Sequence, residues 1–79
     1  MVALPVGVKD IVKVLSGKER TVEWKITVYL TDDGQYYAIA SAGTLSAETP
    51  RAFDVDTVVG FGASCMVEFF EALGVSHAA

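Results

Sequence analysis

The sequence predicts an α+β domain in which an N-terminal and a C-terminal helix pack on a small antiparallel sheet of two to three strands with a central β-hairpin, in the order α-β-β-(β)-α. Two observations carry this prediction. Hydrophobic residues recur at helical spacing towards both ends of the chain, whereas in the middle they alternate with polar residues. With 79 residues, 52% of them hydrophobic, we expect a single domain, residues 1–79, built around one core.

The N-terminal helix is predicted from four apolar residues at the spacing i, i+3, i+4 and i+7, namely Val8, Ile11, Val12 and Leu15. Pro5 is tolerated at the beginning of a helix, and Gly17 is suited to end it. Because β-branched side chains also favour strands, the valines of this segment leave a strand open as the alternative.

The central hairpin is predicted by strict alternation from Arg20 to Leu30, in which the apolar positions are Val22, Trp24, Ile26, Val28 and Leu30. The turn-forming sequence Thr31-Asp32-Asp33-Gly34 follows, and Gly34 readily adopts a positive φ. An extended pattern then resumes over residues 35–43.

The length of the hairpin loop decides which residues of the second strand share a face with Trp24. With a loop of two or four residues, Tyr37 and Ile39 lie on the Trp24 face, and Tyr36 joins Tyr29 on the opposite face. A loop of three residues reverses the second strand. We expect the first arrangement, in which Tyr29 and Tyr36 border a flat face of small side chains, Ala38 and Ala40.

After the hairpin, residues 44–49 are predicted as a loop or a sheet-edge crossing that ends at Pro50. Residues 51–55 form an optional third, short strand. Asp56 or Thr57 is suited to cap the final helix.

The final helix presents a broad apolar surface made of Val58, Phe61, Gly62, Cys65, Met66, Phe69, Phe70 and Leu73. Gly60 and Gly62 each cost a helix about 1 kcal/mol relative to Ala, so its first turns are open to strand or loop structure. Residues 63–73 are the secure portion, and Gly74 is suited to end the helix. Residues 75–79 are expected to form a frayed tail.

Charge is unevenly distributed along the chain, which has 6 Lys and Arg against 10 Asp and Glu and a net charge of -4. Up to Lys25 five basic residues face three acidic ones, but beyond it Arg51 alone faces seven acidic residues. Nucleic-acid phosphates are bound by clustered Lys and Arg, so no direct contact with nucleic acid is expected. A protein partner with a basic surface is favoured.

The reactive residues of the chain argue against an enzyme. One Cys excludes an intrachain disulfide, and one His excludes a multi-histidine metal site. Cys65 lies in the apolar stripe of the helix and His77 in the tail, so a nucleophile and a base are not brought together. We expect no catalytic residue, no metal and no cofactor.

The first eight residues are apolar but lack the basic region of a signal peptide, and no apolar run approaches the roughly 18 residues of a membrane span. The lone thiol suits a reducing compartment. We therefore expect a cytoplasmic protein with no membrane contact. Self-association into a homodimer is compatible with its small core.

Two sets of residues are candidates for partner binding. The first is the aromatic pair Tyr29 and Tyr36 on the sheet face that no helix covers. The second consists of acidic residues expected in the hairpin turn, at the helix cap and on the helix surface: Asp32, Asp33, Asp54, Asp56, Glu68 and Glu71. Such carboxylates would occupy a groove lined by Lys and Arg, while the apolar face anchors the contact.

In size and acidity the chain resembles the small phage-encoded inhibitors that block a host nucleic-acid machine, among them the anti-CRISPR proteins. This resemblance implies a non-enzymatic inhibitor or regulator of a nucleic-acid-handling complex. The segment from Tyr29 to Ala38 is similar to the hairpin of HicB-like antitoxins, which implies the alternative, an antitoxin or another small regulator that binds RNA or a toxin. An α-β-β-β-α order also resembles the double-stranded-RNA-binding domain in layout, but residues 54–60 are acidic and apolar where that family has a Lys-rich run.

Overall fold

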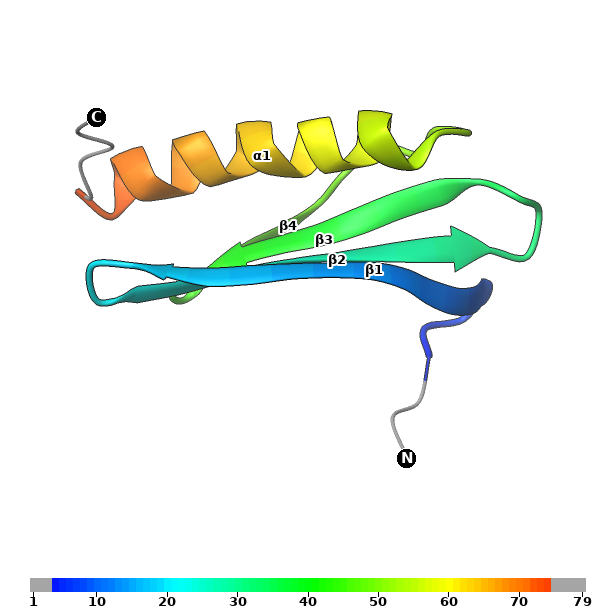
Figure 1. Cartoon of the computed structure of the whole chain (residues 1–79), viewed down its shortest axis with the longest axis horizontal. Helices are drawn as coiled ribbons and strands as arrows, with labels where there is room; N and C mark the ends of the chain where they lie inside the picture. Colours follow the sequence, from blue (N-terminus) through cyan, green and yellow to red (C-terminus); the bar gives the residue numbers. More distant parts are fainter. Residues whose placement is uncertain (1–3, 75–79) are drawn as a thin grey trace.

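The computed structural model describes residues 4–74, and the predicted tail at residues 75–79 lies outside them. Four strands form one antiparallel sheet in the order β1-β2-β3-β4, and a single helix follows them and packs on one face (Figure 1). The elements are β1 (Val8–Glu19), β2 (Val22–Thr31), β3 (Tyr36–Ala42), β4 (Leu45–Glu48) and α1 (Val55–Ala72). The predicted layout with an N-terminal helix and two to three strands is therefore wrong.

The segment predicted as the N-terminal helix is the long edge strand β1. Its pairing with β2 contains two bulges, between Val8 and Asp10 and between Ile11 and Lys13, and each inserts one extra residue. As a result Val8, Ile11 and Val14 lie on the same face of the sheet although they are three residues apart. The bulges thus give Val8 and Ile11 the i, i+3 spacing that also occurs on one face of a helix, whereas Leu15 pairs with Ile26 on the opposite face of the sheet.

The fourth strand also differs from the prediction. Residues 45–48, expected to belong to a loop or a sheet-edge crossing, pair with β3, whereas residues 51–55 contribute only an isolated bridge between Ala52 and Tyr36. Thr49 extends the pairing by one residue, because its N–H donates to the Ala38 carbonyl and its hydroxyl accepts from the Ala38 N–H, both at 2.8 Å. Pro50 has no N–H to donate, so the pairing does not continue past Thr49 and β4 stays short.

The hairpin between β2 and β3 is confirmed, but its expected register is wrong. Leu30 pairs with Tyr36, and the Thr31 N–H donates to the Gln35 carbonyl at 2.8 Å, which leaves a loop of three residues. The Thr31 side chain closes this loop, because its buried hydroxyl accepts from the Gln35 N–H at 3.0 Å. Gly34, as expected, has a positive φ of 85°.

The three-residue loop reverses the faces of β3. Tyr37 and Ile39 lie opposite Tyr29 and Thr27 on the face away from the helix, and the fully buried alanines of β3 lie beneath α1: Ala38, Ala40 and Ala42. These small side chains let the helix approach the sheet closely. Packing of α1 therefore favours this register over the one in which Tyr37 would occupy the core.

The core lies between α1 and the central strands β2 and β3. The helix contributes a line of buried residues one turn apart, Val58, Gly62, Met66 and Phe70. Val28 on β2 is completely buried against this line. Glycine at position 62 permits contact with Ile26, since a Cβ there would lie 3.0 Å from the Ile26 Cγ2 atom.

The helix begins earlier than the sequence indicates, because Asp54 and not Asp56 is its N-cap. The Asp54 carboxylate accepts from the N–H of Thr57 at 2.9 Å and from its hydroxyl at 3.0 Å. Residues 63–72 are helical as expected, with Leu73 as the C-cap. The glycines at positions 60 and 62 lie inside the helix, so their low propensity is outweighed by capping and packing.

Candidate protein-binding surface

The face of the sheet opposite α1 is not covered by a helix within residues 4–74 (Figure 1). The strand register places six large apolar or aromatic side chains on it, which we call the apolar patch: Val8, Ile11, Val14, Tyr29, Tyr37 and Ile39. Within this set Ile11 is 37% and Val14 is 50% exposed. The apolar patch therefore presents its most accessible side chains on the edge strand β1.

Aromatic contacts hold the centre of the apolar patch. The rings of Tyr29 and Tyr37 stack with centroids 5.2 Å apart, and the Arg51 guanidinium carbon lies 5.6 Å from the centroid of the Tyr37 ring. Tyr37 is buried although no helix covers it. Burial, together with the nearby Glu48 and Tyr29, raises the pKa of the Tyr37 phenol above its ordinary value of 10.0, and Arg51 opposes this shift. The phenol is therefore neutral at physiological pH.

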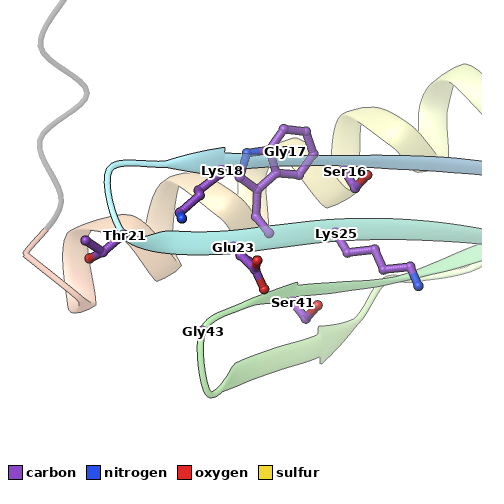
Figure 2. Close-up of a pocket in the computed structure, with 9 residues that line it drawn as sticks. Ser16, Gly17, Lys18, Thr21, Glu23, Lys25, Ser41 and Gly43 are labelled. Carbon is purple, nitrogen blue, oxygen red and sulfur yellow. The ribbon is translucent and has the colours of Figure 1, made fainter.

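The rest of the open face is polar. A shallow hollow of about 810 Å³ lies towards the β1–β2 hairpin and is lined by Ser16, Gly17, Lys18, Thr21, Glu23, Trp24, Lys25, Ser41 and Gly43. In Figure 2 the charged ends of Lys18, Glu23 and Lys25 lie apart from one another along the hollow. Within residues 4–74 no group of three or more His, Cys, Asp or Glu is arranged to hold a metal ion.

The structure gathers four of the six predicted acidic residues at one end of the molecule. Asp32 and Asp33 lie in the β2–β3 turn, and Asp54 and Asp56 lie at the start of α1, which Figure 1 shows at the same end. The two segments are tied together by the Tyr36–Ala52 bridge: the Tyr36 N–H donates to Ala52 O at 2.7 Å, and the Ala52 N–H donates to Tyr36 O at 2.9 Å. We call Asp32, Asp33, Asp54 and Asp56 the acidic end.

Hydrogen bonds keep the turn carboxylate of the acidic end ionised. The Thr31 hydroxyl lies in hydrogen-bond contact with the Asp33 carboxylate and lowers the pKa of Asp33 below its ordinary value of 3.8. Backbone N–H groups and the positive charge of Arg51 act in the same direction, and desolvation opposes them. Asp33 therefore carries its negative charge well below neutral pH.

The other predicted residues are not part of this end. Glu68 and Glu71 are exposed on the later turns of α1, and Asp56 and Glu71 are about 22 Å apart along the helix axis at 1.5 Å per residue. Tyr36 lies on the helix side of the sheet and is half-buried against the core. Tyr37, not Tyr36, is therefore the aromatic neighbour of Tyr29 on the open face.

Two exposed residues at the acidic end were not identified from the sequence. Phe53 is 76% exposed directly before the cap residue Asp54. A hydrophobic residue directly before an N-cap usually packs against the first helical turn. The sequence pattern therefore predicts that Phe53 is buried, and its exposure could not be expected from it. Asp10 pairs with Leu30 and therefore lies next to the β2–β3 turn. The prediction of a helix over this segment gave no reason to place Asp10 beside that turn.

Comparison with protein-family models, with curated proteins and with solved structures gave no match. No helix within residues 4–74 is long and apolar enough to cross a lipid bilayer.

Proposed function

We propose that this chain is a non-enzymatic, cytoplasmic protein-binding module that binds a basic protein surface with its acidic end. The observation that carries the proposal is the convergence of Asp32 and Asp33 with Asp54 and Asp56 through the Tyr36–Ala52 bridge. Clustered carboxylates attract a Lys- and Arg-rich surface at long range and accelerate association.

Apolar anchors beside the carboxylates support the same surface. Phe53 is exposed next to Asp54, and the Tyr29–Tyr37 pair of the apolar patch lies on β2 and β3 close to their turn. Binding energy at interfaces is concentrated in a few aromatic and apolar residues that lose their water, whereas charges mainly govern the rate of encounter. The acidic end and Phe53 thus supply two complementary requirements of a protein interface.

The partner class that suits this surface is a nucleic-acid-handling complex. Such complexes have grooves lined by Lys and Arg that bind phosphates, and the acidic end would occupy a groove of this kind in place of nucleic acid. The chain would then act as an inhibitor or regulator of the anti-CRISPR type, by steric and electrostatic exclusion. Its net charge of -4 is small, so occlusion of part of a groove fits better than imitation of a long phosphate array.

The test measures association rates with a panel of purified nucleic-acid-handling complexes, CRISPR interference complexes among them. The double variant Asp32→Lys with Asp33→Lys should slow association about tenfold, and association of the wild type should weaken steeply with added salt. The matched control is Glu68→Lys with Glu71→Lys, which makes the same charge change on the later turns of α1 and should change the rate less than about threefold.

Three outcomes count against the proposal. Equal effects of the two double variants would show that net charge, and not the acidic end, governs binding. Salt-independent association would contradict the electrostatic mechanism, and retention of the wild-type protein on heparin at low salt would favour direct nucleic-acid binding.

A further inference from the structure

We propose that the second half of β1 pairs with the same strand of a second copy, so that two chains form one continuous eight-stranded sheet. The segment concerned, Lys13–Glu19, is called the dimer edge here. This inference does not rest on the proposed function, because the dimer edge and the acidic end are different surfaces.

The backbone of the dimer edge is regular, and one of its two sides has no partner strand. The sheet order places β1 at the border, so one side of this strand has no neighbouring strand. Both bulges lie before Val14, and from Lys13 to Glu19 each residue pairs with one residue of β2 without a shift. A regular strand border with free N–H and C=O groups is a template for another strand.

Nothing in the described chain covers this border. The helix packs against β3 and β2, and every residue of the dimer edge is exposed except Leu15, which is half-buried. The other border of the sheet is different, since β4 has four residues, Leu45–Glu48, and is followed by Pro50 and by a segment that returns to β3 at Ala52. One border is therefore protected, and the other is long, regular and open.

The charges of the dimer edge select the register and the occupant. In an antiparallel pair of two copies centred on Ser16, Lys13 of each copy lies opposite Glu19 of the other, and Leu15 lies opposite Gly17. Lys13 and Glu19 are on the same face of the sheet, because their β2 partners are Val28 and Val22. Two equivalent Lys–Glu pairs thus form across a two-fold axis.

Within the chain these two charges face apolar partners. Lys13 lies opposite Val28 and Glu19 opposite Val22 in the β1–β2 register, so neither has an opposite charge directly across the strand. A second copy supplies both missing charges at once. This charge complementarity argues for a second copy of the chain and against an unrelated strand.

The same register adds an apolar contact on the helix side of the sheet. The Trp24 ring packs on Gly17, since a Cβ at Gly17 would lie 2.7 Å from its Cζ2 atom. In the proposed pair, Leu15 of the second copy lies opposite this glycine and borders the half-buried Trp24 ring. Trp24 also lines an apolar groove of about 260 Å³ with Ala63, Met66 and Val67 of α1, where Val67 is 47% exposed.

The first test is the molar mass of the full chain by sedimentation across a concentration series, with a dimer expected. Lys13→Glu and Glu19→Lys should each raise the dimer dissociation constant about tenfold, because two attractive pairs become repulsive. The double variant should return within about threefold of the wild type, since the pairs are restored with opposite polarity. Lys9→Glu, on the bulged half of β1, is the matched control and should leave the constant unchanged.

The second test fixes the register by cross-linking. Ser16 lies on the two-fold axis, where the Cα atoms of opposing residues are about 4.5–5.5 Å apart, a separation that a disulfide can span, so Ser16→Cys in a Cys65→Ser background should form an intermolecular disulfide under mild oxidation. Ser41→Cys in the same background is a matched serine on β3 and should not. A monomer at all concentrations, a double variant weaker than either single variant, assemblies larger than a dimer, or no cross-link at Ser16 would each overturn the proposal.

Discussion

Gly62 of α1 lies against Ile26 of β2 so closely that a Cβ on the glycine would be 3.0 Å from the Ile26 Cγ2 atom and 3.3 Å from its Cδ1 atom. Gly60, one half-turn earlier, is exposed and has no atom within 4 Å of its corresponding position. Both glycines destabilise the helix by the same low intrinsic propensity, but only Gly62 allows close packing against Ile26.

These two glycines provide a matched prediction about packing. Gly60→Ala should raise the free energy of unfolding by about 0.5–1 kcal/mol, because the helix gains propensity and the new methyl group meets open space. Gly62→Ala should lower it by about 1 kcal/mol, because crowding against the buried Ile26 exceeds the gain in propensity. Urea unfolding at one fixed protein concentration measures both changes. Stabilisation by both substitutions would contradict the close contact.

A second prediction concerns the tight turn between β1 and β2. Arg20 has a positive φ of 57°, the only such value of a non-glycine residue in the described chain, and it is the first of two loop residues between the paired Glu19 and Val22. Because a side chain destabilises this conformation, Arg20→Gly should raise the free energy of unfolding by about 0.5–1 kcal/mol. Arg20→Lys keeps the side-chain penalty and the charge, so its thermal midpoint should stay at the wild-type value.

A third prediction follows from the raised pKa of Tyr37. Burial keeps the phenol protonated in the folded protein at a pH where the unfolded chain has already lost that proton. Since the folded state then binds more protons, stability is fully present below the ordinary pKa of 10.0 and falls as pH rises towards the folded pKa. Urea unfolding between about pH 8 and about pH 11 should show this loss, and Tyr37→Phe should reduce it. An equal loss in both proteins would assign the effect to other groups.

A fourth prediction concerns the turn that sets the hairpin register. Thr31→Val removes the hydroxyl that contacts the Asp33 carboxylate and accepts from the Gln35 N–H, so the pKa of Asp33 should rise towards its ordinary value of 3.8. In the wild type the lowered pKa contributes stability above the ordinary value, and this contribution is lost as pH falls through the folded pKa. Titration of Asp33 by NMR measures the shift. Thr31→Ser retains the hydroxyl and should retain the lowered pKa.

The sequence located the candidate site only in part. Acidic residues are visible in the sequence as turn and cap residues, but their convergence depends on the Tyr36–Ala52 bridge, which joins residues that are sixteen positions apart. The exposure of Phe53 likewise depends on where the chain passes between that bridge and the cap at Asp54. Local patterns report which residues favour a turn, and long-range pairing decides which turns lie together.

The sequence by itself determined those elements whose hydrophobic pattern is compatible with only one type of secondary structure. The alternation from Val22 to Leu30 permits only a half-buried strand, and the apolar spacing after residue 63 permits only a helix packed on one side. The tertiary structure decided that residues 8–19 form the strand β1 and not a helix. Two bulges in the pairing with β2 produce the spacing of Val8 and Ile11, which a helix would also give. The tertiary structure also decided which residues of β3 face the helix. A change of one residue in the length of the hairpin loop would place Tyr37 in the core in place of Ala38, and close packing of α1 favours the alanines.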